Sequence, residues 1–271
     1  MEQEKNEAEE IKTHGVRVRF SDAPWFTWLA GRPVFVLGVG GIGSWTAFCL
    51  DRIGCVVTIW DDDVVEQHNI GGQMYGPSSI GGSKVEALED VCARLTGIAN
   101  TSLLIRDERY VASSYVCPIT IAAFDNMAAR KLAFEKWAAS PLSKDGIFID
   151  GRLLAEDYQI YAVLPGREEA YRRTLFSDDE IRAEPCTLKS TTHCSLGIAA
   201  DIVALLTNFA ANKVTMEGFG VEMRDVPFKV SKSLPIFDYR ITLEPDGDGG
   251  NTEITEEKVK SDQESTAPVL T

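Results

Sequence analysis

Residues 34–44 have the sequence Val34-Phe35-Val36-Leu37-Gly38-Val39-Gly40-Gly41-Ile42-Gly43-Ser44. Four apolar residues precede a glycine-rich turn, and an apolar segment rich in helix formers follows it. This order predicts a buried parallel strand, a tight turn and the first turn of a helix. The rest of the chain can be placed around this unit.

The glycines of the turn have distinct expected tasks. Gly38 permits the turn, Gly40 has no side chain to hold a phosphate away from the backbone, and Gly43 allows close packing of the helix on the strand. Free N–H groups at a helix start attract an anion. The candidate nucleotide-binding residues are therefore Gly38, Gly40, Gly41 and Gly43. A tight turn without a ligand is the alternative for such a glycine pattern taken alone.

The residues that follow complete a nucleotide-binding unit. We predict a helix over residues 45–52, its end at Gly54, and a second buried strand over residues 55–60. This strand ends at Asp61-Asp62-Asp63, about twenty residues after the glycine turn, which is the spacing of the carboxylate that binds a ribose hydroxyl. An acidic cluster at a strand end is also typical of a solvated loop.

Further strands and helices alternate along the chain. Strands are expected near residues 102–105, 119–123, 147–152 and 158–164, short strands within 214–242, and helices over 84–95, 127–137 and 195–209. Three strands end in polar groups, at Asp61, Asp125 and Asp150, and the carboxyl ends of parallel strands share one ligand-binding crevice. We predict an α/β fold with a Rossmann-like, doubly wound, mostly parallel sheet and an antiparallel extension.

The composition suggests three parts. Residues 1–30 are expected to form an N-terminal arm and a helix, and residues 31–242 one nucleotide-binding domain. Within this domain, residues 165–185 are charged and irregular, as in a connection or lid. Residues 243–271 are acidic without a core pattern, which indicates a disordered, solubilising tail.

Charge, hydropathy and cysteine usage exclude several classes. The formal net charge of −14 argues against a nucleic-acid partner, because phosphates need a basic face. No apolar run approaches the roughly 20 residues that span a bilayer, and the N-terminus lacks a signal-peptide pattern, so we expect a cytoplasmic protein without a membrane partner. The six cysteines form no CxxC pair and are expected to be reduced thiols.

Several separated motifs resemble those of the ubiquitin-activating enzyme superfamily, most closely its ThiF/MoeB-type adenylyltransferases. The matching segments are the glycine loop from Gly38 to Gly43, Asp61-Asp62-Asp63-Val64 with Asn69 and Gln73, Ile80-Gly81 with Lys84, and Asp125-Asn126 with Arg130. The resemblance spans residues 32–210. Because it rests on several motifs, it is more specific than a glycine turn.

These enzymes attach AMP to the C-terminal carboxylate of a small ubiquitin-fold protein. The resemblance implies an ATP- and Mg²⁺-dependent homodimer that adenylylates a ubiquitin-like or sulfur-carrier protein with a glycine-ended tail. The implied roles are Asp61 for the ribose, Asn69 and Lys84 for the phosphates, Asp125 for Mg²⁺, and Asp63, Gln73 and Asn126 as further cofactor-binding residues. Taken alone, Lys84 is more typical of a solvated helix residue.

The chain departs from the family pattern in two ways. Gly72 stands where relatives usually carry an arginine that helps to neutralise the triphosphate. Arg17 or Arg19 is the predicted replacement, because relatives bring an N-terminal arginine across a dimer interface. Many relatives hold a structural zinc with two CxxC pairs, which this chain lacks, so we expect no zinc.

Cys186 is the candidate nucleophile. Pro185-Cys186-Thr187-Leu188-Lys189 resembles the segment that carries the thioester cysteine in ubiquitin-activating enzymes. A thiolate would attack the acyl adenylate, with Lys189 and His193 lowering the pKa of the thiol. Buried filler is the alternative, and Cys194 is the second candidate. The cysteines expected in the core are Cys49, Cys55, Cys92 and Cys117.

The acceptor's tail has an expected channel. By the same resemblance, Asp150-Gly151-Arg152 and Tyr158-Gln159 would line it, since relatives bind an extended Gly-Gly end near this region. Arg152 has two expected partners, an acidic group on the acceptor or Glu156 of this chain.

Three other functions fit parts of the pattern. A related adenylylating enzyme could act on a peptide carboxylate or a tRNA base, although the acidic charge disfavours tRNA. An NAD(P)-binding oxidoreductase would use the glycine turn and Asp61, but it leaves Lys84 and Asp125-Asn126 without a role. A nucleotide-sensing scaffold without catalysis is compatible with Gly72.

Overall fold

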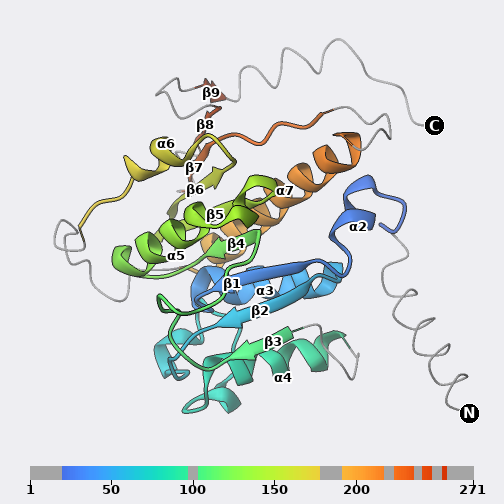
Figure 1. Cartoon of the computed structure of the whole chain (residues 1–271). Helices are drawn as coiled ribbons and strands as arrows, with labels where there is room; N and C mark the ends of the chain where they lie inside the picture. The colour runs from blue at the N-terminus through green and yellow to red at the C-terminus, as the bar shows by residue number, and fades with distance from the viewer. Residues whose placement is uncertain are drawn as a thin grey trace, which may run out of the picture.

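The computed structural model describes residues 20–96, 103–177, 191–216, 223–234, 240–245 and 252–254. Over these residues nine strands form one sheet with helices on both faces (Figure 1). The strands are β1 (Pro33–Leu37), β2 (Val56–Trp60), β3 (Leu103–Arg106), β4 (Ile119–Ala122), β5 (Ile147–Leu154), β6 (Asp157–Val163), β7 (Lys229–Ser233), β8 (Arg240–Glu244) and β9 (Thr252–Ile254). The helices are α2 (Pro24–Leu29), α3 (Gly41–Ile53), α4 (Lys84–Thr96), α5 (Met127–Ala139), α6 (Glu168–Arg172) and α7 (Thr192–Met216), with 3₁₀ turns η1 (Gln67–Asn69), η2 (Pro77–Ser79) and η3 (Pro141–Asp145).

Five strands pair in parallel in the order β3-β2-β1-β4-β5. Leu37 at the end of β1 pairs with Trp60 of β2 on one side and with Ala122 of β4 on the other. The apolar runs of β1, β2 and β4 are largely buried, as parallel strands covered on both faces require. α3 ends at Gly54, whose φ of 100° is the left-handed conformation that favours glycine. The predicted Rossmann-like α/β fold is confirmed.

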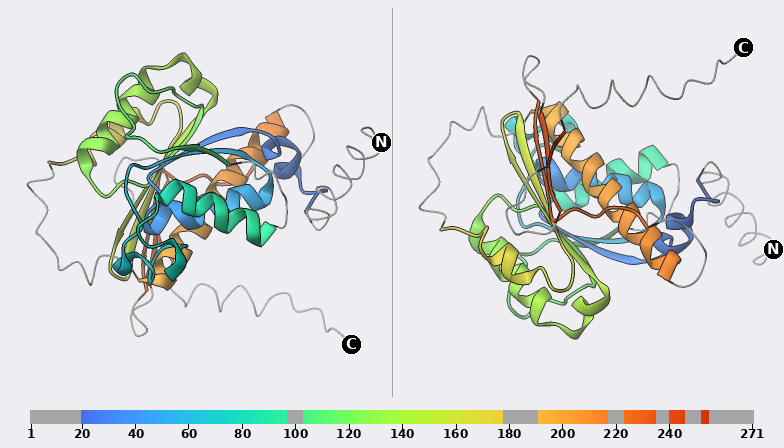
Figure 2. Two further views of the ribbon diagram at one scale, coloured as in Figure 1. Left: turned by 90° about the horizontal axis from the view of Figure 1, so that it is seen from below. Right: turned by 90° about the horizontal axis from the view of Figure 1, so that it is seen from above.

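The two faces of the sheet carry different helices. α5 and α6 cover one face through an aromatic cluster that includes Phe134, Trp137 and Tyr171. α2, α3, α4 and α7 cover the other face through aliphatic residues such as Leu50 and Ile198. Figure 2 shows the sheet between these two helical layers.

The antiparallel extension is longer than the sequence predicts. β6, β7, β8 and β9 follow β5 in antiparallel order. β8 crosses the expected domain boundary after residue 242, and β9 lies inside the range 243–271, for which no packed structure was expected. The pairing of Thr252 with Leu243 and of Ile254 with Ile241 gives this short β-branched segment a place in the sheet. α6 likewise forms within the stretch 165–185 that was expected to be irregular.

α7 corrects the expectation about apolar runs. Its residues Thr192–Thr215 have a mean hydropathy of 1.7 and are long enough to cross a membrane. The helix instead packs against α2, α3, β5 and β6, so its apolar composition is that of a core helix. Gly151 permits this approach, because a Cβ there would lie 3.1 Å from Ile202 of α7 and 3.2 Å from Ile42 of α3.

Candidate active site

The candidate site lies at the carboxyl ends of β1, β2 and β4. These ends are in register, so the segments that leave them start side by side. The glycine loop follows β1, Asp61 follows β2, and Asp125 comes three residues after β4. The aligned strand ends therefore bring the glycine loop, Asp61 and Asp125 to one edge of the sheet.

The glycines of the loop are required for different reasons. Gly38 has a φ of 88°, and a Cβ there would lie 2.9 Å from the Ala123 carbonyl oxygen. A Cβ on Gly43 would lie 1.8 Å from the Gly38 carbonyl oxygen, so the fold itself excludes a side chain there. A Cβ on Gly40 would approach only Gln73 Nε2, at 3.9 Å. Gly40 therefore leaves space beside Gly41, where α3 begins. The first N–H groups of this helix have no partner within the helix, and such groups bind phosphate.

Asp61 is fixed by hydrogen bonds from two segments. Its Oδ2 accepts the Val39 N–H at 2.8 Å, and its Oδ1 accepts the Asp63 N–H at 2.9 Å. The Tyr75 hydroxyl donates to the Val39 carbonyl at 2.6 Å and so holds the same loop. Burial raises the pKa of the Asp61 carboxyl, an effect opposed by Lys84 and the two N–H donors. The carboxylate is thus held beside the glycine loop, where a ribose hydroxyl would meet it.

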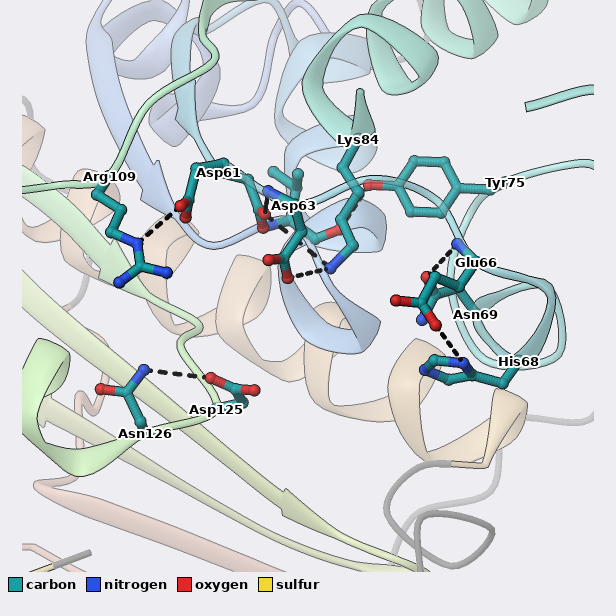
Figure 3. Close-up of polar contacts among 12 residues, drawn as sticks. Asp61, Asp63, Glu66, His68, Asn69, Tyr75, Lys84, Arg109, Asp125 and Asn126 are labelled. Carbon is teal, nitrogen blue, oxygen red and sulfur yellow. Dashed lines mark hydrogen bonds and ion pairs between the residues drawn. The ribbon is translucent and has the colours of Figure 1, made fainter. Parts of the chain in front are cut away.

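Lys84 is an integral part of the site. Its Nζ lies 2.7 Å from Asp63 Oδ2 and 4.0 Å from Asp61 Oδ1, and its side chain is only 9% exposed (Figure 3). The loop before α4 is closed by hydrogen bonds from Val65 N–H to the Gly82 carbonyl and from Gly81 N–H to the Val65 carbonyl, both 2.8 Å. This closure turns Lys84 inward at the helix start. The alternative of a solvated lysine is therefore wrong.

Asn69 and Gln73 lie on the turn around η1. Asn69 is buried, and its Oδ1 accepts the Glu66 N–H at 2.8 Å in a capping box. Gln73 approaches the glycine loop, and its Oε1 is buried without a hydrogen-bond partner among the described residues. A buried, unpaired amide oxygen is costly and is typical of a ligand or water position. Trp45 anchors this turn to α3 by donating to the Gly72 carbonyl at 3.1 Å.

Asp125 and Asn126 have different roles in the turn between β4 and α5. Both are exposed on the turn between β4 and α5. Asn126 Oδ1 accepts the Ala129 N–H at 2.8 Å and caps α5, and its amide donates to Asp125 Oδ1 at 3.2 Å (Figure 3). A carboxylate presented in this way suits Mg²⁺, which takes one or two carboxylates together with substrate phosphates. Asn126 orients that carboxylate, in addition to its predicted cofactor contact.

The expectation that Asp150 faces the crevice is wrong. β5 continues through Asp150 to Leu154, and the Asp150 side chain is fully buried. Its carboxylate accepts hydrogen bonds from Arg130, Arg152 and Tyr171. Arg152 does not pair with Glu156, because it donates to Asp150 and Thr174. A fully buried carboxylate is stable only when it is paired with charged and hydrogen-bonding groups. These partners hold Asp150 inside the fold.

Arg109 is a site neighbour that the sequence did not reveal. It follows β3, and its Nε donates to Asp62 Oδ2 at 2.7 Å. An exposed arginine in a loop carries no motif that would single it out. The carboxylates of Asp61, Asp62 and Asp63 lie within 4.8 Å of one another, as in a cation site. The Lys84 ammonium already supplies positive charge there, which favours Asp125 as the Mg²⁺ ligand.

The thiols separate into two groups. Cys186, together with Arg17 and Arg19, lies outside the described residues. Cys194, the second candidate nucleophile, is buried at the start of α7, and burial raises the pKa of its thiol, so that candidate is wrong. The expected core cysteines are confirmed for Cys55, Cys92 and Cys117, which are buried, while Cys49 is half-buried.

Solved structures with the same architecture include two other proteins. PaaA is 18% identical, with 88% of this chain and 74% of PaaA aligned at a TM-score of 0.65. MccB from E. coli, solved with ATP, is 15% identical, with 82% of this chain aligned at a TM-score of 0.62. The chain spans 66% of that MccB chain, just under two thirds. None of the curated protein sequences matches the chain. At these identities the likeness establishes the fold.

The family follows from a second comparison. The ThiF family model matches residues 28–218, which is well over half of the chain and includes the glycine loop, Asp61, Lys84 and Asp125. The predicted resemblance is thereby confirmed over the segments that build the site. The chain therefore belongs to the ThiF family.

Proposed function

We propose that this chain uses ATP to adenylylate the carboxylate of a polypeptide substrate. One observation carries the proposal: the glycine loop, Asp61, Lys84 and Asp125 meet at the carboxyl ends of neighbouring parallel strands. Nucleotides bind at such an edge, with phosphates at the glycine turn and the ribose at the acid that follows the next strand. An oxidoreductase needs no buried lysine at that place, and membership of the ThiF family disfavours one.

The residues would bind ATP in a defined order along the edge. The phosphates would be held by the N–H groups of α3 beside Gly40, and the ribose hydroxyls would donate to Asp61, with Asp63 beside it. Lys84 would exchange its contact with Asp63 for a phosphate oxygen. Asn69 and Gln73 close the site from the η1 side, where the orphaned Gln73 oxygen lies.

The reaction transfers AMP. A carboxylate oxygen of the acceptor attacks the α-phosphorus, the bond between that phosphorus and the bridging oxygen breaks, and pyrophosphate leaves with the electron pair. Lys84 and the helix N-terminus stabilise the negative charge on the phosphoryl oxygens. Mg²⁺ would be held by Asp125 and would supply charge neutralisation to the phosphates. The acyl adenylate that forms is activated for a later nucleophile.

Two classes of acceptor fit the proposal. The family resemblance favours a ubiquitin-like or sulfur-carrier protein with a glycine-ended tail. MccB, a microcin C7 biosynthetic enzyme, has been solved with N-formylated MccA, and this neighbour favours a short peptide as the second candidate. Both acceptors present a main-chain carboxylate, so the same site serves either.

Four features of the proposal rest on the sequence. They are a thioester on Cys186, a homodimer, Arg19 reaching the triphosphate across the dimer interface, and a cytoplasmic location. The thioester step would be attack of the Cys186 thiolate on the acyl adenylate with release of AMP. Cys186→Ser separates this step from adenylation, because the first step does not use the thiol.

Exchange of labelled pyrophosphate into ATP tests the proposal. The acceptors are a ubiquitin-fold protein ending in Gly-Gly and a set of short peptides, each paired with the same polypeptide carrying a C-terminal amide. We expect exchange with at least one free carboxylate and none with its amide. Exchange with neither acceptor class, in a protein that binds NADH, would favour the oxidoreductase instead.

A further inference from the structure

Asp150 lies at the centre of a buried ionic cluster beside the candidate site. Arg130 of α5 contacts its Oδ1, Arg152 donates to its Oδ2 at 2.7 Å, and the Tyr171 hydroxyl of α6 donates at 2.9 Å. Two arginines and one aspartate give the cluster a formal charge of +1. Neutralising Asp150 needs only one arginine, so the second arginine requires another explanation.

Arg130 makes contacts that charge balance does not require. Its guanidinium donates to the Gly151 carbonyl at 2.7 Å and also to the Phe124 carbonyl. Phe124 directly precedes Asp125. Arg130 therefore joins the middle of β5 at Gly151 to the turn that leaves β4, and Asp150 anchors the guanidinium between them.

The turn is fixed on its other side as well. Asn126 caps α5 through the Ala129 N–H at 2.8 Å and donates to the Asp125 carboxylate at 3.2 Å. Asp125 itself remains exposed. An exposed carboxylate between two anchored neighbours has a restricted backbone, as a preorganised ligand needs.

We propose that Arg130, anchored by Asp150, is a positioning residue for Asp125. It acts through the Phe124 carbonyl and holds the carboxylate where Mg²⁺ and the phosphates of ATP meet it. The inference rests on the proposed function. Lysine cannot replace Arg130, because a single ammonium cannot reach three acceptors that the planar guanidinium fork reaches together.

The test measures the binding of AMPCPP by calorimetry with and without Mg²⁺. In Arg130→Lys, the gain in affinity that Mg²⁺ provides should fall about 10-fold or more, the usual effect of losing a group that orients a metal ligand. Affinity without Mg²⁺ should stay within about twofold, since the glycine loop and Asp61 are untouched. If Arg130 served folding alone, the substitution would change the AMPCPP affinities with and without Mg²⁺ by the same factor.

Arg152→Lys is the matched control. Arg152 also binds Asp150, but its other hydrogen bonds go to Thr174. It should therefore keep the full Mg²⁺ gain. If Arg130→Lys does not fold, the same measurement is made on Arg130→Gln. This variant leaves Asp150 and Arg152 as a neutral ion pair, so no buried charge is left unpaired.

The outcomes are distinct. An unchanged Mg²⁺ gain in the Arg130 variant overturns the inference. An equal loss in Arg152→Lys also overturns it, because the hydrogen bonding of the whole Asp150 cluster would then matter rather than the Phe124 contact. A wild-type protein that binds AMPCPP equally well without Mg²⁺ rejects the metal role of Asp125 in the proposed function, and the inference with it.

Discussion

The Lys84 ammonium lies 2.7 Å from the Asp63 carboxylate, which is 21 positions earlier in the chain. The contact places a nearly buried cation at the carboxyl end of β2, directly beside the carboxylate proposed to bind ribose. A phosphate must therefore compete with Asp63 for this lysine. The pair predisposes the site toward polyanionic ligands, because the lysine is already oriented and desolvated.

Lys84→Met should weaken the binding of AMPCPP far more than that of adenosine. The phosphates lose a charged partner, so we expect about a 10-fold or larger loss for AMPCPP, whereas adenosine should change by about twofold at most. Calorimetry with both ligands measures the difference. An equal loss for the two ligands would mean that the substitution distorts the site instead of removing a phosphate contact.

The glycine loop allows stability and binding to be separated. In Gly43→Ala the new Cβ meets the Gly38 carbonyl oxygen at 1.8 Å, so the free energy of unfolding should fall by about 3 kcal/mol. In Gly40→Ala the Cβ meets only Gln73 Nε2 at 3.9 Å, so stability should change by less than about 1 kcal/mol. Nucleotide affinity should nevertheless fall in Gly40→Ala. Urea unfolding measures the stability of both variants, and AMPCPP titration measures their nucleotide affinity. A Gly40→Ala protein that binds AMPCPP as tightly as the wild type would contradict the prediction.

Nucleotide binding should depend on pH through Asp61. Burial raises the pKa of this carboxyl above its ordinary value of 3.8, so ionisation costs folding stability at neutral pH, and this cost disappears as pH falls through the folded pKa. Only the carboxylate accepts from both ribose hydroxyls, so affinity should decline on acidification before an ordinary aspartate would protonate. Lys84→Met should move the inflection to higher pH, because Lys84 lowers the pKa. A shift to lower pH would be inconsistent with the Asp61–Lys84 pairing.

The buried cysteines should resist alkylation in the folded protein. Burial raises the pKa of Cys117 to about 11 and that of Cys92 to about 12, and Cys117 Sγ also donates to the Pro33 carbonyl at 3.2 Å. We expect iodoacetamide at pH 8 to modify these two thiols at least about 100-fold more slowly than in urea. Peptide mass spectrometry gives the rate at each cysteine. Rapid labelling of Cys117 in the native protein would contradict the burial, and Cys186 is the thiol predicted to react first.

The sequence predicts the βαβ unit well because its signals are local. Apolar runs, the glycine turn and the acid after β2 each lie within a few residues of the feature they specify. The same locality explains the prediction of Asn126 and Asp125 at a strand-to-helix turn. Contacts between distant segments, such as Lys84 with Asp63, become visible only when the loop before α4 closes.

Asp150 shows where local reasoning fails. A strand followed by an acid is the same pattern at Asp61 and at Asp150, yet β5 continues through Asp150 and turns it toward α5 and α6. The partners that bury it, Arg130 and Tyr171, come from elements 20 or 21 residues away. No periodicity in the sequence distinguishes a carboxylate at an open edge from one inside such a cluster.

The most direct measurement of the central claim is pyrophosphate exchange with a carboxylate acceptor that supports it in the wild-type protein, repeated with Asp125→Ala and Lys84→Met. The account predicts that both variants fold and that each loses about 100-fold or more of the exchange rate, because each removes a group that stabilises phosphate charge. Wild-type exchange rates in a folded Asp125→Ala protein would contradict it, since the proposed Mg²⁺–ATP site would then not be where the reaction occurs.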